Sequence, residues 1–440
     1  SSTANPYFLF PQIYNFRYNI YSSEWPVANR AIELYLQKKS ENEGWERQIN
    51  GLSNNEKANL LLEKHTFKEL LADVEQRNLQ NNIVGLEASR LFARSEINMG
   101  VDAFRDSLYA MLKRNTFLNI KFENMLDTLG EMSRTDLYSY LKEWEQLTPL
   151  PFYSIGEPEL TKVVNKGGEE FFVLKVLVSN NSDYDGIIQM NVLQNGWWYQ
   201  PMEDPRARKK VEIAAHTSKE FVSVWEEQIR DVEINTMVSG NLPYMIRQSI
   251  GNVKQERNKI VKDTIYTLPE SSLEMPGEVI VDNEDSTLFV LSTPAVVGLL
   301  PKWLDKVEDT SFKYSGISWW RAPLQWTATT NAKYYGKYIR SAYVIKSGDG
   351  SQTATWKIPV PEAGQYELYY HVFKDDELRW NDRLQGEYHF RVAYDSEMED
   401  AYINLRKANE GWEQLGTYYF SADTVRVVLT DECKLRSVTA

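Results

Sequence analysis

The spacing of apolar residues changes once along this chain, near Gly156, and the change limits the folds that the chain can adopt. Before Gly156, apolar residues recur every three or four positions, which is typical of amphipathic helices. After it, they alternate one by one with polar residues, which is typical of strands with one buried face. The sequence therefore predicts a multi-domain α+β protein, with helices first and sheets after them.

Residues 1–155 form the predicted helical domain. One apolar stripe contains Val101, Phe104 and Leu108, and other stripes of the same spacing precede and follow it. Each stripe is one-sided, so a helix can bury it only against neighbouring helices. We expect an N-terminal helical bundle or short solenoid that ends at Pro149 and Pro151.

Two antiparallel β-sandwich domains are predicted after the helices. Residues 156–245 contain short alternating segments and form the smaller sandwich. Residues 246–277 are polar, and we expect one helix and then a linker there. Residues 278–440 alternate strictly and form the second sandwich. Within it, Asp349-Gly350 predicts the tight turn of a hairpin.

Charge, cysteine content and hydropathy exclude several classes of protein for this chain. The net charge is -13, and a chain this acidic would repel a phosphate backbone, so no nucleic acid is expected as partner. The single cysteine, Cys433, excludes an intramolecular disulfide. The longest apolar stretch, 288–300, is interrupted by Pro294 and is too short to span a bilayer, so the chain is not itself membrane-spanning. It begins at Ser1, without Met or a signal peptide, which is typical of a mature or partial chain.

No catalytic residue, metal site or cofactor is predicted. The four histidines, at positions 65, 216, 371 and 389, lie outside any HExxH motif and have no metal-ligand spacing on one helix. The chain contains no GxSxG motif, no phosphate-binding loop and no full GxGxxG. The acidic run 282–285 lacks the glycine and closing glutamate of an EF-hand and favours a solvated turn.

Tryptophans beside polar residues are the leading functional candidates. A flat indole can stack on the apolar face of a sugar ring, while neighbouring Asp or Arg side chains bind its hydroxyls. The alternative is that these tryptophans fill the core or the contacts between domains. The candidate glycan-binding residues are Arg379, Trp380 and Asp382 in one polar insertion, and Trp319, Trp320 and Arg321 before the last sandwich. By contrast, Trp356 and Trp412 stand in or beside alternating segments, so we assign both to the core.

The C-terminal part resembles a known family of binding domains. The segments WKIPVPEAGQYELYYHV, YHFRVAYDSE and NEGWEQLGTYYFSADTVRVVLTD resemble, in order and spacing, the golvesin/xanthan-lyase-type carbohydrate-binding domain over about residues 320–440. The matching residues are Trp356, Gly364, Tyr366, Tyr388, Trp412, Leu415, Gly416 and Phe420. The resemblance implies a β-sandwich that occurs in bacterial extracellular polysaccharide proteins. The family closes with an Ala-Asp-Ala-Val-Arg strand, and this chain stops at Ala440, so we expect that terminal strand to be missing.

Residues 83–244 resemble, more weakly, the part of HExxH (gluzincin) aminopeptidases that follows the zinc site. The segments that carry this resemblance are GVDAFRDSLYAML, FENMLDTLG, DLYSYLKEWEQLTPLPFY and FFVLKVLVSNN. The zinc ligands and the general-base glutamate are absent from this chain. Under this resemblance they would either lie upstream of residue 1 or have been lost, and this chain alone could not perform that chemistry.

The function predicted from these features is that of a non-catalytic extracellular or envelope protein that binds or scaffolds. The C-terminal domain would bind glycan, and the partners would be polysaccharide or other envelope proteins. The two resemblances, occurring together in one chain, suggest a protein of a Bacteroidetes species with an outer-membrane-associated or periplasmic location. Two alternatives stay open at this point. One is the C-terminal portion of a zinc aminopeptidase-like protein, and the other is a structural subunit of an outer-membrane assembly.

Overall fold

The computed structural model describes residues 18–37, 43–193, 204–251, 253–257, 261–271, 273, 277–292, 312–317, 321–374, 386–395, 397–421 and 423–440. Contacts within the chain divide it into two compact units. Unit 1 consists of residues 1–41 and 54–272, and unit 2 of residues 42–53 and 273–440. The fold is multi-domain α+β, with most helices in the first third of the chain and antiparallel sheets after them, as predicted.

The helical part of unit 1 is built around the longest described helix, α5, which contacts α1, α3, α6 and α7. The aromatic rings of Trp25, Phe67 and Trp144 pack against one another in the core of this part, with centroids 4.6–6.1 Å apart. Trp25 and Phe67 stack, and Trp144 meets both edge to face. A short parallel pair of strands, β1 and β2, joins the start of the described chain to the helices. The elements are β1 (Asn19–Tyr21), α1 (Ala28–Leu36), α3 (Asn54–Leu62), α4 (Phe67–Ala72), η1 (Glu75–Asn78), α5 (Gln80–Met99), α6 (Val101–Arg114), β2 (Asn119–Lys121), α7 (Phe122–Ser133), α8 (Leu137–Lys142) and η2 (Glu143–Glu145).

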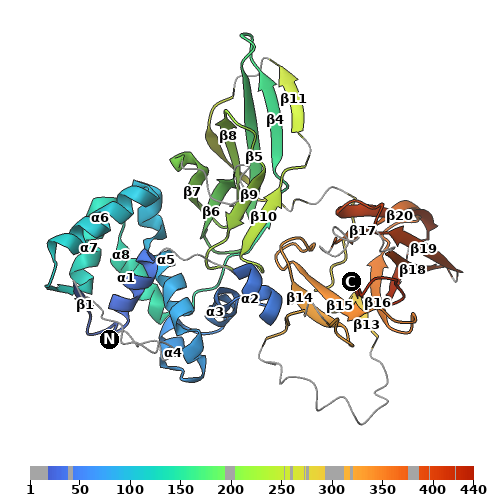
Figure 1. The fold of residues 1–440 in the computed structure, drawn as a ribbon, viewed down its shortest axis with the longest axis horizontal. Helices are drawn as coiled ribbons and strands as arrows, with labels where there is room; N and C mark the ends of the chain where they lie inside the picture. Colours follow the sequence, from blue (N-terminus) through green and yellow to red (C-terminus); the bar gives the residue numbers. More distant parts are fainter. Residues whose placement is uncertain are drawn as a thin grey trace. The chain divides into compact units, whose positions relative to one another are not determined.

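The described strands of unit 1 other than β1 and β2 form two sheets that enclose a core of apolar side chains, among them Tyr153, Leu174, Ile188 and Phe221. One sheet has the strand order β10-β9-β6-β7, and the other β11-β4-β5-β8-β12, with β3 also paired to β5 (Figure 1). The elements are β3 (Tyr153–Ile155), β4 (Glu159–Val164), β5 (Glu170–Asn180), β6 (Gly186–Leu193), η3 (Pro205–Ala207), β7 (Arg208–Ile213), β8 (Thr217–Trp225), β9 (Asp231–Asn235), β10 (Met245–Ser249), β11 (Val253–Arg257) and β12 (Thr264–Pro269).

The helix and linker expected over 246–277 are wrong for the first part of that segment. Strands β10, β11 and β12 follow one another there, and each pairs with a strand of the sandwich. Strands β11 and β12 are the two edge strands of their sheet, and β12 is exposed along most of its length, so neither needs the long apolar run that marks a central strand. The polar composition of this segment is thus that of edge strands rather than of a helix and a linker. The domain boundary expected near residue 156 stays a prediction.

Two ion pairs, one of them buried, join the helices to the sandwich within unit 1. Glu96 of α5 and Lys210 of β7 form an ion pair with side chains 0% and 7% exposed. Tyr35 donates a hydrogen bond from its hydroxyl to Glu96 Oε1 at 2.8 Å. Beside them, Arg94 donates to Glu212 Oε1 from both Nε and Nη2. Because a buried carboxylate is costly without partners, these contacts fix how α5 lies against β7.

Unit 2 is the second sandwich, with its core formed by residues such as Val372, Phe390, Val392 and Leu429. Its three sheets have the strand orders β13-β16-β21-β18-β19, β14-β15-β22 and β17-β20. The elements are α2 (Glu43–Asn50), β13 (Phe289–Leu291), β14 (Thr327–Thr330), β15 (Ser341–Lys346), β16 (Thr353–Pro359), β17 (Gly364–Val372), β18 (Glu387–Tyr394), β19 (Glu397–Asn404), β20 (Gly411–Phe420), β21 (Thr424–Thr430) and β22 (Ser437–Thr439).

The hairpin expected at Asp349-Gly350 is wrong, although the turn itself is present. Gly350 has φ 86°, a left-handed conformation that glycine adopts readily. The strands on either side belong to different sheets, because β15 pairs with β14 and β22, whereas β16 pairs with β13 and β21. The turn therefore carries the chain from one sheet to another.

Helix α2 belongs to unit 2 although it lies far earlier in the sequence. Thr330 of β14 donates a hydrogen bond from its hydroxyl to the Gly51 carbonyl at 3.0 Å. The backbone of Gly316 also comes so close to Ile49 that a Cβ atom on this glycine would lie 2.0 Å from the Ile49 carbonyl oxygen. Residues 42–53 are thus an early segment that completes a late domain. None of the described helices is long and apolar enough to cross a membrane.

Candidate functional site

The exposed face of the β17·β20 sheet carries the most distinctive surface of unit 2. One face of this antiparallel pair turns Tyr366, Leu368, Tyr370, Tyr418 and Phe420 towards the core. The other face is exposed for most of its side chains and forms what we call the outer ladder. Its members are Gln365, Glu367, Tyr369 and His371 on β17, and Trp412, Gln414, Thr417 and Tyr419 on β20.

Three large aromatic side chains stand exposed in this ladder. Tyr369, Trp412 and Tyr419 are 45%, 47% and 65% exposed. Rings of this size usually find a partner or a ligand, because each offers a wide apolar face to water. The outer ladder is therefore a surface suited to stacking.

A β-bulge places Trp412 on this surface. Leu368 pairs with Gly416 and Tyr369 pairs with Gln414, so Leu415 is an extra residue on β20. Because side chains alternate with period two, one inserted residue moves everything on one side of it to the opposite face. Trp412 and Tyr418 would share a face in a regular strand, but the bulge turns Trp412 outwards.

The assignment of Trp412 to the core is therefore wrong. The assignment of Trp356 is confirmed, since it is partly buried and packs on Phe289, with ring centroids 5.2 Å apart. The sequence did contain the signal for Tyr369, because it alternates with the inward-facing Tyr366, Leu368 and Tyr370. No alternation rule could have found Trp412 without knowledge of the bulge.

The Trp412 indole is held by two other rings. The His371 ring meets it edge to face, with centroids 5.3 Å apart and an interplanar angle of 85°. The Tyr335 ring lies 4.8 Å away at 60°. Burial, with a smaller contribution from Arg340, lowers the pKa of His371 to about 4. His371 is therefore neutral near pH 7 and acts as an uncharged support for the indole.

Polar groups occupy the middle of the ladder. Tyr369 donates a hydrogen bond from its hydroxyl to Glu367 Oε2 at 2.6 Å, which fixes the direction of the phenol. The same hydrogen bond raises the pKa of Tyr369, so the phenol stays protonated. Gln414 donates from Nε2 to Thr417 Oγ1 at 3.2 Å. The face thus combines flat rings at its ends with amide, hydroxyl and carboxylate groups between them.

The residues named from sequence as glycan-binding are mostly not placed by the structure. Trp319, Trp320, Arg379, Trp380 and Asp382 lie outside the described residues. Arg321 lies in the described part of the chain and is exposed. The candidate site that the described residues support is accordingly the outer ladder, in the same domain but on other residues.

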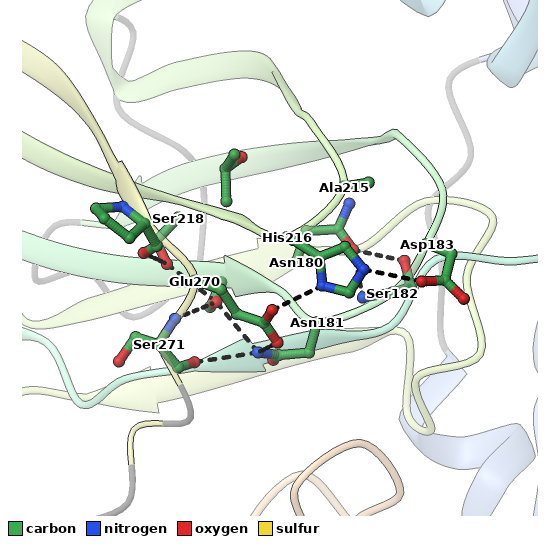
Figure 2. Close-up of polar contacts among 12 residues, drawn as sticks. Asn180, Asn181, Ser182, Asp183, Ala215, His216, Ser218, Glu270 and Ser271 are labelled. Carbon is green, nitrogen blue, oxygen red and sulfur yellow. Dashed lines mark hydrogen bonds and ion pairs between the residues drawn. The ribbon is translucent and has the colours of Figure 1, made fainter.

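A second polar cluster lies at the end of the unit 1 sandwich (Figure 2). His216, in the turn before β8, lies with Nδ1 2.7 Å from Glu270 Oε2 and Nε2 2.8 Å from Asp183 Oδ1. A carboxylate can only accept, so both ring nitrogens must donate and the ring is an imidazolium in this arrangement. Hydrogen bonds to Asp183 and Glu270 raise the pKa of His216 accordingly.

This second cluster holds the chain where it leaves β12. Asn181 donates from Nδ2 to Glu270 Oε1 at 2.8 Å and to the Ser271 carbonyl at 3.1 Å, and Ser271 N donates to Ser179 Oγ at 3.0 Å. With both His216 nitrogens engaged by carboxylates, the ring has no free nitrogen to take a proton from a nucleophile. We therefore interpret the cluster as a clamp on residues 270–271. Among the described residues, no group of three or more His, Cys, Asp or Glu side chains could hold a metal ion.

One family model matches the part of the chain that contains the outer ladder. Residues 320–440 match the family model described as the Golvesin C-terminal domain, which confirms the resemblance noted above and includes the whole ladder. No curated protein matches the chain. The solved structure of a Paenibacillus xanthan lyase is similar at 15% identity and a TM-score of 0.25, over 67% of this chain and 26% of that one, so the chain spans about a quarter of that protein's length. Neither match supports the aminopeptidase resemblance of residues 83–244.

Proposed function

We propose that this chain is a non-catalytic extracellular protein that binds polysaccharide through its C-terminal golvesin-type domain. The observation that carries the proposal is the row of exposed rings, Tyr369, Trp412 and Tyr419, on one face of that domain. Sugar rings offer an apolar C–H face and a fringe of hydroxyls, and the outer ladder presents rings with hydrogen-bonding groups between them. The buttressing of Trp412 by His371 and Tyr335 supports this, because a pre-positioned ring loses little freedom on binding.

The test is binding of the purified chain to a glycan array, followed by titration of Trp412→Ala. We expect wild type to bind at least one polysaccharide and Trp412→Ala to lose most of that affinity. The matched control is Tyr402→Ala, because Tyr402 is also an exposed aromatic residue of unit 2, 55% exposed, but lies on β19. Equal losses in both variants, or no glycan bound by wild type, would count against the proposal.

The residues named from sequence are kept as a second set of glycan contacts. In the sequence, Trp319, Trp320 and Arg321 lie between β13 and β14, and Arg379, Trp380 and Asp382 lie between β17 and β18. We propose that they extend the surface that the outer ladder begins. Trp380→Ala and Trp320→Ala should each weaken binding to the same glycan without lowering the melting temperature. If both leave affinity unchanged, the ladder acts alone.

We further propose that the protein works in a bacterial envelope, either at the extracellular face in association with the outer membrane or in the periplasm. The support is the family that the C-terminal domain matches, together with the net charge of -13 of the chain. Its partners would be polysaccharide or other envelope proteins. Fractionation of the producing cells, with antibody detection of this chain, tests the location. Recovery in the cytoplasmic fraction would exclude it.

A further inference from the structure

We infer, on the basis of the proposed glycan-binding function, that the outer ladder takes an extended, uncharged polysaccharide chain that lies along β17 and β20. Two features of the ladder carry this inference. One is the distance between its aromatic ends, and the other is the sign of its charge.

The aromatic residues form two stations at opposite ends of the ladder. Trp412 is paired with His371 at one end, and Tyr419 is paired with Gln365 at the other. His371 and Gln365 are six residues apart on β17, so at about 3.4 Å per residue the two stations stand roughly 20 Å apart. That span is well beyond a disaccharide. A ligand that touches both stations is therefore a chain of several sugars.

The Trp412 station is the stronger of the two. Tyr369 lies diagonally across the strand pair from Trp412, at a separation of about 7–8 Å that neighbouring rings can bridge. Tyr335 and His371 complete this station. Tyr419 stands 65% exposed and supplies one ring. A short ligand should accordingly bind at Trp412, and only a longer one should gain the contact with Tyr419.

The polar middle suits hydroxyl groups rather than charged ones. Of the eight ladder side chains, Glu367 is the only one charged near pH 7, because the pKa of His371 is lowered to about 4. A uronate placed over Glu367 would meet a like charge at short range, whereas a neutral sugar would offer hydroxyl donors to the same carboxylate. Two described cations near the ladder already have partners. Arg340, which lies close enough to act on His371, donates to the Ala332 carbonyl at 2.8 Å, and Lys333 forms an ion pair with Glu410 at 3.1 Å. The middle of the ladder, around Glu367, therefore disfavours acidic sugars.

The experiment is calorimetric titration of the purified chain with neutral linear oligosaccharides of two and six sugars. The panel contains β-glucan, xylan, mannan and chitin oligomers, with oligogalacturonates of the same lengths beside them. For the neutral glycan that binds, we expect the hexamer to bind more tightly than the dimer. Tyr419→Ala should weaken the hexamer roughly two- to tenfold, the worth of one stacked ring, and leave the dimer unchanged. Trp412→Ala should weaken both, and Tyr419→Phe should behave like wild type.

The outcomes separate this inference from the proposed function. If dimer and hexamer bind equally, or if Tyr419→Ala is silent while Trp412→Ala abolishes binding, the extended chain is overturned and glycan binding stands. Tighter binding of oligogalacturonate than of every neutral hexamer overturns the charge argument in the same way. If no oligosaccharide binds wild type, both the inference and the proposed function fail. Thermal unfolding of each variant shows whether a loss of affinity comes from loss of fold.

Discussion

Trp412 and His371 stand directly opposite each other in the β17·β20 ladder, and their rings meet edge to face. The histidine supports one edge of the indole and leaves Trp412 47% exposed. A neutral imidazole provides this support without bringing a charge to the surface. The pair explains why a large ring can remain rigid on an open face.

Replacing Trp412 should cost little stability. The side chain is half exposed, so Trp412→Ala should lower the free energy of unfolding of unit 2 by at most about 1.5 kcal/mol. Phe390 lies in the same unit and is 0% exposed. Phe390→Ala should therefore lower the free energy of unfolding by about 3–5 kcal/mol. Urea denaturation of both variants checks the contrast. A loss for Trp412→Ala as large as that for Phe390→Ala would mean that Trp412 is a core residue after all.

Unit 2 should lose stability as the solution becomes acidic, because of His371. Its folded pKa is about 4, below the ordinary value of 6.5, so between these values the unfolded chain binds more protons than the folded one. The contribution of His371 to the free energy of unfolding is therefore fully present above pH 6.5. It decreases as pH falls towards 4, by roughly 3 kcal/mol in total. Burial raises the pKa of Asp282, in the same unit, to about 6, which stabilises the fold as pH decreases over the same range. Urea denaturation at several pH values should therefore show the His371 slope as the difference between wild type and His371→Phe. His371→Phe keeps a ring beside Trp412 and should remove it, and an unchanged slope in the variant would place the titration elsewhere.

The clamp at His216 should respond to pH in the opposite direction. Its pKa is raised by Asp183 and Glu270, so the stabilisation is present below the unfolded value of 6.5 and is lost as pH rises through the higher folded value. The Ser271 amide, which donates to Ser179, should then exchange its hydrogen faster at high pH than the intrinsic base-catalysed increase accounts for. Hydrogen-exchange mass spectrometry of residues 264–271 measures this. His216→Gln should show fast exchange at every pH, and protection equal to wild type in that variant would rule out the clamp.

The ion pair between helix α5 and strand β7 should be costly to break from one side. Lys210→Met leaves Glu96 buried without its nearest cation, although Arg105 remains 3.9 Å away, so we expect a loss of about 3 kcal/mol from unit 1. Glu96→Gln combined with Lys210→Met removes both charges and should recover most of that loss, while Gln still accepts from Tyr35. Thermal and urea unfolding of the single and double variants provides the measurement. A double variant less stable than Lys210→Met alone would contradict the argument.

The limits of prediction from sequence are visible at particular residues. The alternation of Tyr366, Leu368 and Tyr370 was enough to predict β17 and its buried face. The same rule failed at Trp412 because Leu415 is an extra residue that reverses the alternation between Trp412 and Tyr418. A leucine side chain gives no sign of a bulge. The strands between Met245 and Pro269 escaped notice because edge strands need no continuous apolar run.

Long-range pairing sets the other limit. The Asp349-Gly350 turn was located correctly, but local turn chemistry does not state whether the next strand returns to the same sheet. Likewise, no local pattern relates His216 to Glu270, which are 54 residues apart and meet only because β12 pairs with β8. Contacts of this kind depend on the tertiary fold rather than on any window of sequence.

The membership of helix α2 in unit 2 has a consequence for how this domain can be moved between genes. The chain passes from one unit to the other near residues 41, 53 and 272 instead of once. A fragment that starts at Leu273 would lack residues 42–53, which accept the hydrogen bond of Thr330. A fragment that ends at Ser272 would contain residues 42–53 without the rest of unit 2. Unit 2 therefore cannot be separated from the rest of the chain by a single cut. Any fusion or transplant that preserves it must carry residues 42–53 as well, or rebuild that helix on the recipient side.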